Sequence, residues 1–442
     1  MTSTDTPVPT TDPRRLRRVA VASFIGTTVE WYDFYIYSTA AALVFATLFF
    51  PGQAPGTGTL LAFATYAVGS IGRPLGAIVF GHMGDRVGRK LVLTVTLTVM
   101  GVCTVLIGLL PTYASIGIWA PILLTVLRFV QSFGVGGEWG GAVLLAVEHA
   151  PRKRRIFYGS LPQTSSALAL MISTGVFALL ALTSHEQMLA WGWRVPFLLS
   201  APLIAFGLVV RRTVEETPEF LALERRQAKT RVPLAEVLRH HWRPLLLGVG
   251  AILITISGFY LSSTFMIFYG TDQKLFSESA MLAGVTFTGF VAVFATPLAG
   301  LLGDRFGARR TVAWSTIASA AVSFPMFWLT NSGVVAAMWL GMTLVMVTSS
   351  LAYGGVSGLV AGWFPAKVRN SGISLAYQLA GVLGAGLSPV IATALYGVGA
   401  TPYLWVAVFL AGMSLVSFAC VVAYRGRDHL MPVPPDAAPV TT

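Results

Sequence analysis

Charged residues are rare inside the long apolar stretches of this chain, and three of them, Glu30, Asp33 and Arg128, could do chemistry together. Glu30 and Asp33 are three residues apart, so on a helix they share one face, and Tyr37 continues that face four residues later. Burial in an apolar medium favours the neutral form of a carboxyl group, so these side chains could take up and release a proton. Arg128 could supply the opposite charge, because a guanidinium holds a carboxylate through two parallel hydrogen bonds.

These residue types predict an exchange of partners. Arg128 would bind ionised Asp33 when the site is empty, and would bind an anionic ligand once Asp33 is protonated. Gln131, three residues after Arg128, and Tyr37 are further candidates for contact with that ligand. The alternative is a permanent ion pair between Asp33 and Arg128 that only fixes two helices.

The composition places these residues inside a membrane. The chain has 442 residues, of which 55% are hydrophobic and only 11% are charged, whereas soluble domains carry about 25% charged residues. A helix needs roughly 20 apolar residues to cross a bilayer. Twelve stretches qualify, namely 19–49, 57–80, 91–110, 119–147, 157–182, 193–210, 244–270, 280–302, 311–330, 333–362, 371–396 and 402–424.

The basic residues predict the orientation. Every Lys and Arg except Arg73, Arg128, Arg194 and Lys274 lies in the N-terminal arm, the C-terminal tail, a central connector or the loops after spans 2, 4, 8 and 10. By the positive-inside rule, both termini are therefore predicted to be cytoplasmic. The net charge of +12 is then a signal of topology, and a nucleic-acid partner is not expected.

The chain also repeats itself. The pattern G-x-x-G-D-R-x-G occurs at 81–88 and again at 300–307, about half the chain apart. We therefore predict five parts, which are an arm at 1–18, a six-helix half at 19–210, a connector at 211–243, a second six-helix half at 244–424 and a tail at 425–442. Duplicated halves are typical of carriers that rock around a binding site near the membrane midplane.

At this point the sequence resembles the major facilitator superfamily over almost its whole length. Several segments are similar to its metabolite:proton symporter family, which includes shikimate, α-ketoglutarate, citrate and proline/betaine carriers, and the order of motifs is similar to the shikimate branch. The segments are VEWYDFYIY (29–37), GRPLGAIVFGHMGDRVGRK (72–90), LRFVQSFGVGGEWGG (127–141), WGWRVPF (191–197) and VEETPEF (214–220). The resemblance implies an all-α membrane fold of twelve helices.

The resemblance also implies roles for particular residues. It implies a part in proton transfer for Arg128, and a cap on a helix of the other half for Asp85. We expect an ion pair between Arg73 and Glu138 nearer the cytoplasmic end, and Glu148 as a partner for the basic loop. The predicted gating set is Gly81, Gly84, Asp85, Arg86, Gly88, Arg89, Arg73, Glu138, Glu148, Asp304 and Arg305.

The second half offers only uncharged polar residues inside its spans. The predicted substrate contacts there are Tyr260, Tyr353, Tyr377 and Gln378, joined by Gln163 from span 5. Each of these side chains could equally serve helix packing. Proton coupling through carboxylates must then lie in the first half.

The leading functional hypothesis is proton-coupled symport, in which a small organic acid anion or zwitterion such as shikimate is imported by alternating access. Alternatives are an uncoupled facilitator, a proton antiporter and, outside transport, a solute sensor. The missing G-P-x-x-G in span 5 favours symport over efflux. An enzyme is not expected, because the chain has no Ser/His/Asp set or phosphate-binding GxxxxGK[ST] loop. We expect a monomer in the plasma (inner) membrane, with substrate, proton and lipid as partners and with no cofactor or metal.

Overall fold

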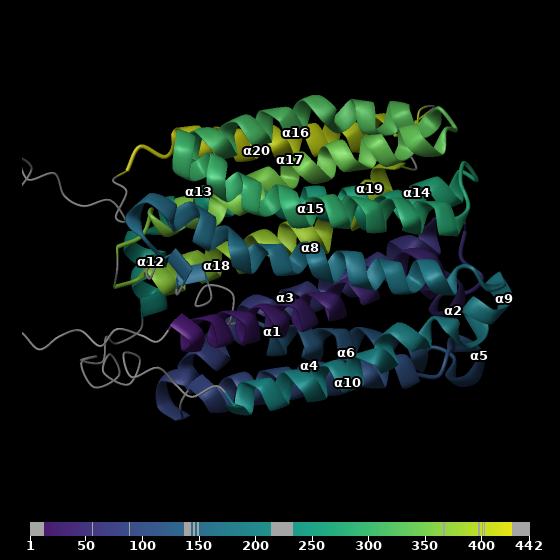
Figure 1. Ribbon diagram of the computed structural model, residues 1–442. Coiled ribbons are helices and arrows are strands. Elements are labelled where there is room, and N and C mark those ends of the chain that lie inside the picture. Colours follow the sequence, from purple (N-terminus) through teal and green to yellow (C-terminus); the bar gives the residue numbers. More distant parts are fainter. Residues whose placement is uncertain are drawn as a thin grey trace, which may run out of the picture.

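The computed structural model describes residues 13–54, 56–87, 89–136, 143–144, 146–147, 150–213, 233–365, 367–396, 398–399, 401 and 403–426. Long helices lie side by side through this part of the chain, joined by short turns at the two ends of the bundle (Figure 1). The apolar runs form helices because, inside a bilayer, a helix satisfies its own backbone hydrogen bonds.

The first half begins with α1, which continues through a π-helical turn into α2. Its long helices are α1 (Pro13–Ala40), α3 (Thr57–Val87), α4 (Arg89–Leu109), α6 (Trp119–Gly134), α8 (Arg155–Leu180) and α10 (Arg194–Thr213). Its short elements are η1 (Ala41–Phe45), α2 (Ala46–Phe49), α5 (Tyr113–Ile116), η2 (Arg152–Arg154), α9 (His185–Gln187) and η3 (Met188–Gly192).

The second half follows the short helix α12 (Pro233–His240). Its long helices are α13 (Trp242–Tyr260), α15 (Glu278–Phe306), α16 (Ala308–Asn331), α17 (Val335–Ala361), α18 (Arg369–Gly381) and α20 (Leu404–Ala423). Four shorter elements extend α13 and α18, namely η4 (Leu261–Phe265) with α14 (Met266–Asp272), and η5 (Val382–Leu387) with α19 (Ser388–Tyr396).

The helices account for all twelve predicted spans. Nine are long and apolar enough to cross a membrane within the described residues, and a tenth span is bent by 43° between His185–Gly192 and Arg194–Val209. Two shorter apolar helices, Thr94–Leu109 and Trp119–Gly134, supply the others. The predicted all-α fold is therefore confirmed. The fourth predicted span runs to residue 147, but the described helix α6 ends at Gly134.

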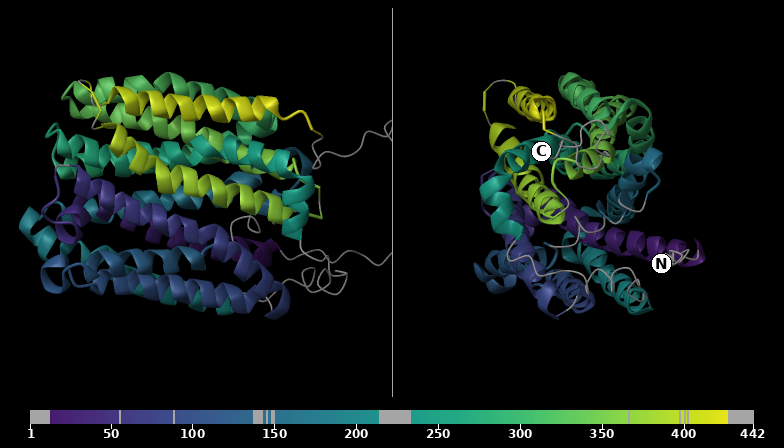
Figure 2. Two further views of the ribbon diagram at one scale, coloured as in Figure 1. Left: turned by 180° about the vertical axis from the view of Figure 1, so that it is seen from behind. Right: turned by 90° about the vertical axis from the view of Figure 1, so that its left-hand side faces the viewer.

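The two halves meet along a few helix pairs. Helix α8 packs along α15 and α17, and α3 packs against η5 and α19. In Figure 1, α4, α6 and α10 lie on one side of the bundle and α16, α17 and α20 on the other. The end-on view in Figure 2 shows the same division, with the purple-to-teal helices below and the green-to-yellow helices above. Helices α1, α3, α8, α13 and α15 therefore form the middle of the molecule.

The structure repeats one local feature between the halves. The first helix of each half carries a π-helical turn, η1 (Ala41–Phe45) after α1 and η4 (Leu261–Phe265) after α13. All five residues of η4 are buried, and η1 packs against α14. Such turns break the regular hydrogen-bond ladder and often occur at functional sites. Each of the two helices that flank the centre thus has a matching irregular segment.

Candidate functional site

Asp33 is held by hydroxyl groups from two other helices. Its carboxylate is fully buried in α1. Ser200 on α10 donates to Oδ1 at 2.7 Å, and Thr104 on α4 donates to Oδ2 at 2.8 Å. Both carboxylate oxygens thus have a donor, which is what a buried carboxylate requires.

Arg128 is linked to Asp33 by a chain of hydrogen bonds. The Arg128 Nη1 donates to Gln131 Oε1 at 2.6 Å, and Gln131 Nε2 donates to Thr104 Oγ1 at 2.6 Å. Within the part of the chain that the structure describes, no ion pair joins Arg128 directly to Asp33. The structure therefore has two polar side chains between them, and the direct exchange of partners stays a prediction.

The Arg128 guanidinium lies among aromatic rings. Its central carbon is 4.5 Å from the centre of the Phe34 ring, 4.5 Å from that of Tyr37 and 4.3 Å from that of Tyr66. Ring faces attract a cation, but they do not satisfy its N–H groups. The buried Nε and Nη2 of Arg128 have no hydrogen-bond partner among the described residues. This guanidinium can still bind an anion.

Close packing of α3 against α6 places Arg128 at this position. A Cβ atom added to Gly69 would lie 2.5 Å from Cγ of Arg128, and one added to Gly76 would lie 1.8 Å from the carbonyl oxygen of Phe133. Small residues let membrane helices approach closely. The glycines of α3 therefore bring the backbone of α6, and with it Arg128, toward the middle of the bundle.

Arg73 lies beside the same aromatic ring as Arg128. It is buried on α3, with its guanidinium carbon 3.8 Å from the centre of the Phe34 ring and 5.7 Å from that of Trp31. Its Nε has no hydrogen-bond partner among the residues described. Glu138, its predicted partner, lies outside the described residues, so that pair stays a prediction.

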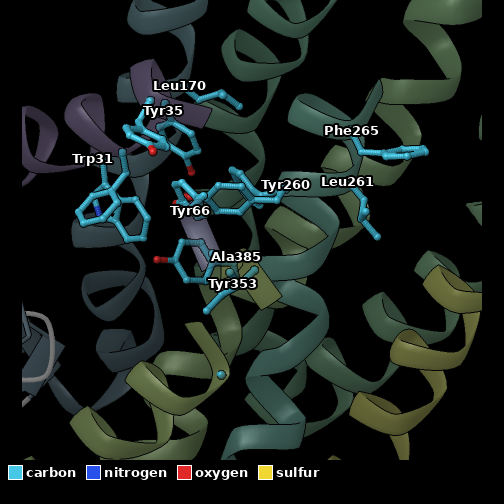
Figure 3. Close-up of a cluster of buried hydrophobic side chains, with 14 of the residues drawn as sticks. Trp31, Tyr35, Tyr66, Leu170, Tyr260, Leu261, Phe265, Tyr353 and Ala385 are labelled. Carbon is cyan, nitrogen blue, oxygen red and sulfur yellow. The ribbon is translucent and has the colours of Figure 1, made fainter. Parts of the chain in front are cut away.

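A cluster of tyrosines joins the two halves (Figure 3), and Tyr66 of this cluster contacts Arg128. The hydroxyls of Tyr66 on α3 and Tyr260 on α13 are 2.5 Å apart, and the Tyr35 ring lies 5.7 Å from that of Tyr260. The hydroxyls of Tyr353 and Tyr377 are 2.8 Å apart within the second half. Three predicted substrate contacts, Tyr260, Tyr353 and Tyr377, are thus brought together in a polar aromatic centre.

The other predicted contacts lie around this centre. Tyr37 shares a hydrogen bond of 2.6 Å with Thr65 on α3 while its ring faces Arg128. Gln163 is buried in α8, and Glu30 is buried in α1. Gln378 reaches across the molecule instead, because its Nε2 donates to the carbonyl oxygen of Gly136 at 2.8 Å. Gln378 therefore contacts the first half beyond the end of α6.

The second copy of the loop motif also connects the halves. The Asp304 carboxylate accepts hydrogen bonds from the backbone N–H groups of Ile156 at 2.9 Å and Phe157 at 3.1 Å. It therefore caps the start of α8, where backbone N–H groups lack partners and the helix dipole favours a negative charge. Arg305, next to Asp304, is exposed and lies 5.2 Å from the centre of the Phe306 ring.

The first copy of the motif is only partly described. Gly81, Gly84, Asp85 and Arg86 belong to the last turns of α3, and Arg89 begins α4. Gly88, Glu138 and Glu148 lie outside the described residues. The proposed cap by Asp85 and the pairing of Glu148 therefore stay predictions.

Sequence reasoning missed five side chains of the site. Trp31 and Tyr35 are four residues apart on α1, a spacing that could have identified Tyr35 as part of an aromatic face. Tyr66 is a single polar aromatic residue in an apolar span. Thr104 and Ser200 are isolated hydroxyls in apolar runs, and no local pattern distinguishes them from hydroxyls that bond only to their own helix.

Sequence comparison identifies related proteins. Residues 19–243 match the family described as sugar (and other) transporter, and residues 275–440 match the major facilitator superfamily. The chain is 41% identical to the inner membrane metabolite transport protein YhjE of Escherichia coli K12, over 90% of this chain and 92% of that protein. It is 40% identical to the shikimate transporter of the same strain, over 91% and 93%. It is 35% identical to the proline/betaine transporter of Salmonella typhimurium, over 86% and 78%.

Solved structures show the same fold. A D-xylose-proton symporter superposes with a TM-score of 0.71 at 18% identity, over 95% of this chain and 100% of that chain. The partially occluded inward-open xylose transporter XylE of E. coli superposes with a TM-score of 0.72 at 15% identity, over 94% and 98%. The relatives are transporters and not enzymes, as the sequence predicts. The chain therefore belongs to the major facilitator superfamily and, within it, to the metabolite:proton symporter family, close to the shikimate transporter.

Proposed function

We propose that this protein imports a small organic acid anion or zwitterion, such as shikimate, together with a proton, by alternating access. The observation that carries the proposal is the buried Arg128, which has unfilled donors and is linked to a fully buried Asp33 beside a polar centre between the halves. The names of the relatives support the substrate class, and the xylose–proton symporters share the fold.

In this mechanism the arginine binds the substrate and the carboxyl group carries the proton. A substrate carboxylate accepts hydrogen bonds from Nε and Nη2 of Arg128, the two nitrogens without partners among the described residues. Asp33 takes up the proton, which cancels a buried charge before the site closes. Substrate and proton then cross together, because either alone leaves an unpaired buried charge.

The tyrosine centre connects substrate binding to the movement of the two halves. Tyr66 and Tyr260 hold opposite halves through one hydrogen bond, so a substrate between the halves must replace or rearrange that bond. Hydroxyl groups of a ligand such as shikimate can bond to these phenols in place of their mutual contact. Rocking of the halves then exposes the centre to one side of the membrane at a time.

We also propose where the protein works. The related YhjE protein is named as an inner membrane protein, and the basic loops support cytoplasmic termini. In the structure, the start of α1 and the end of α20 lie at the same end of the bundle (Figure 1). The protein acts as a monomer in this proposal, because the site is built from one chain.

The proposal is tested by uptake into proteoliposomes. The panel is shikimate, α-ketoglutarate, citrate, proline and betaine, each with and without an inward proton gradient. Symport predicts that at least one compound accumulates and that a protonophore abolishes the accumulation. Equilibration unaffected by the gradient would instead make the protein a facilitator.

Asp33→Asn is the variant that tests the proton site. It should exchange substrate across the membrane but no longer accumulate it, because an amide cannot carry a proton. Glu30→Gln, on the same helix face, is the matched control and should still accumulate substrate. Normal proton-driven accumulation by Asp33→Asn would exclude Asp33 as the proton carrier.

A further inference from the structure

We infer that Thr104, together with Gln131, is the relay by which substrate binding at Arg128 controls the protonation of Asp33. The inference rests on the proposed function, whose substrate and proton sites it connects. Thr104 and Gln131 are positioning residues here, since the proton resides on Asp33.

The central tyrosines and Asp33 lie on different sides of α1. Residues two apart on a helix point in nearly opposite directions. Trp31 and Tyr35 face the central tyrosines, and their rings stack at 5.9 Å. Asp33, between them in sequence, instead bonds to α4 and α10. Coupling of substrate and proton therefore needs a connection around α1.

The hydrogen-bond chain supplies this connection. It runs from Arg128 Nη1 to Gln131 Oε1, and from Gln131 Nε2 to Thr104 Oγ1, which donates to Asp33 Oδ2. All four side chains are fully buried. Hydrogen bonds in such chains polarise one another, so donation by Gln131 makes the Thr104 hydroxyl a better donor to the carboxylate.

Thr104 has two acceptors for its single hydroxyl hydrogen. Its Oγ1 lies 2.8 Å from Asp33 Oδ2 and 2.9 Å from the carbonyl oxygen of Met100. When Asp33 is ionised, the hydrogen is donated to Oδ2. When Asp33 is protonated, the carboxyl O–H donates to Thr104 Oγ1 and the Thr104 hydrogen turns to Met100. The Thr104 hydroxyl and the Asp33 carboxyl group therefore keep their hydrogen bond to each other in both states, and no heavy atom has to move.

The hydrogen-bond chain couples substrate and proton in the direction that symport needs, because substrate binding favours protonation of Asp33. A substrate carboxylate on Nε and Nη2 neutralises the guanidinium, which then polarises Gln131 less through its Nη1 hydrogen bond. The donation from Gln131 to Thr104 is then weaker, and Thr104 stabilises the ionised carboxylate of Asp33 less well. Asp33 therefore takes up a proton more readily when substrate is bound.

Other ionisable groups near Asp33 do not provide an equivalent path. Among the described residues, the groups that interact electrostatically with Asp33 are Arg128 on α6 and Tyr32 on α1. Tyr32 donates to the carbonyl oxygen of Pro196. Further ionisable side chains on the surrounding helices include Glu30, Tyr35 and Tyr37 on α1, Arg73 and Tyr66 on α3, and Cys103 on α4. Arg194 on α10 donates to the carbonyl oxygens of Gly108 and Leu110.

The test is a double-mutant cycle on the protonation of Asp33, without any ligand. Infrared difference spectra of the purified full chain in nanodiscs follow the carboxyl C=O band, which Asp33→Asn identifies by removing it. Gln131→Leu should raise the pH of half-protonation by about one unit, the effect of weakening one hydrogen bond to a charged group. In a Thr104→Val background the same change should have no further effect.

Two control variants separate the relay from general damage. Thr104→Ser keeps the hydroxyl and should behave as the unmodified protein. Ser200→Ala removes the other hydrogen bond to Asp33, so it should raise the pH of half-protonation while leaving the effect of Gln131→Leu intact. Equal effects of Gln131→Leu in the Thr104 and Thr104→Val backgrounds would overturn the relay.

A second measurement separates the relay from the proposed function. Shikimate uptake driven by a proton gradient is measured for the same variants across external pH. The relay predicts that Thr104→Val retains uptake to higher pH and that Thr104→Ser has the original pH profile. Without proton-driven uptake of any panel compound, the proposed function fails while the ligand-free cycle still decides the relay. A Thr104→Val profile identical to that of the unmodified protein would contradict the relay alone.

Discussion

At the scale of single residues, Asp33 and Arg128 are stabilised to different degrees. A charge at the centre of a membrane helix costs about 2.5–3.5 kcal/mol on insertion scales, and each hydrogen bond to a charged group contributes roughly 1.5–3 kcal/mol. Asp33 accepts two such bonds. Arg128 makes one, with two nitrogens unfilled among the described residues. An arriving anion therefore stabilises the charge of Arg128 more than a further hydrogen-bond donor would stabilise the charge of Asp33.

Arg128→Lys should raise the KM for the transported anion by about tenfold or more. Lysine keeps the charge but loses the planar fork that binds a carboxylate twice, and it stacks less well on the three rings. The measurement is initial uptake rate against substrate concentration. Arg194→Lys is the control, because Arg194 donates to carbonyl oxygens near the end of α4, and its KM should not change. An unchanged KM in Arg128→Lys would remove the guanidinium from the substrate site.

At the scale of elements, helix ends and close helix contacts position these residues. Asp304 at the end of α15 caps α8, which ties the second half to the first at the end of the bundle where the basic loops are. Glycines of α3 bring α6 within contact of its backbone. The helix cap and the close helix contact both join elements that are not adjacent in sequence.

Asp304→Asn should open this end of the bundle more often. The loss of a charged cap costs about 1 kcal/mol, which corresponds to about a fivefold change in an opening equilibrium. The measurement is the labelling rate of a cysteine placed at Ser357, which is buried where α17 meets α8. Arg305→Gln changes the exposed neighbour and should leave the rate unaltered. No increase in Asp304→Asn would show that the cap does not hold this contact.

Gly69→Ala should destabilise the protein by about 1–3 kcal/mol, the usual effect of overpacking. The added Cβ would lie 2.5 Å from Cγ of Arg128, so α3 and α6 must separate. The midpoint of thermal unfolding in detergent should fall, and uptake should fall with it. Gly412→Ala on α20 is the control, because an added Cβ there meets nothing within 4 Å. Equal midpoints for the two variants would contradict the close approach.

At the scale of the whole molecule, the halves are in contact at both ends and at the centre. Asp304 caps α8 at one end. At the other end, Nδ1 of His185 in α9 lies 3.2 Å from Oε1 of Glu278 in α15, and η1 packs on α14. Tyr66 and Tyr260 join the halves between these ends. Alternating access therefore requires that the contacts of one end break while those of the other end persist.

Tyr66→Phe and Tyr260→Phe should each raise the KM severalfold, and the double variant should raise it further. The reason is that the substrate replaces the mutual hydrogen bond of the two phenols and bonds to each of them, so each hydroxyl contributes separately to binding. Substrate concentration curves for the three variants provide the measurement. Tyr269→Phe removes a bond to Asn331 inside the second half and should leave the KM unchanged. A double variant with the KM of either single variant would show that the two hydroxyls do not bind the substrate separately.

The sequence by itself determined the number and type of the elements. Membrane helices follow from local hydropathy, because each apolar run must satisfy its backbone within itself. The same local signal identified Asp33 and Arg128 as charges inside apolar spans. It could not assign their neighbours, and it predicted a direct pair where the structure has Gln131 and Thr104 between the two charges.

Only the tertiary structure decided which residues meet. Thr104 and Ser200 lie far from Asp33 in sequence, and they reach it because α4 and α10 pack beside α1. Tyr66 meets Tyr260 because α3 and α13 face each other across the two halves. A hydroxyl in an apolar run has the same local pattern whether it bonds to its own helix or to another. The packing of helices distant in sequence therefore carries the information that local composition lacks.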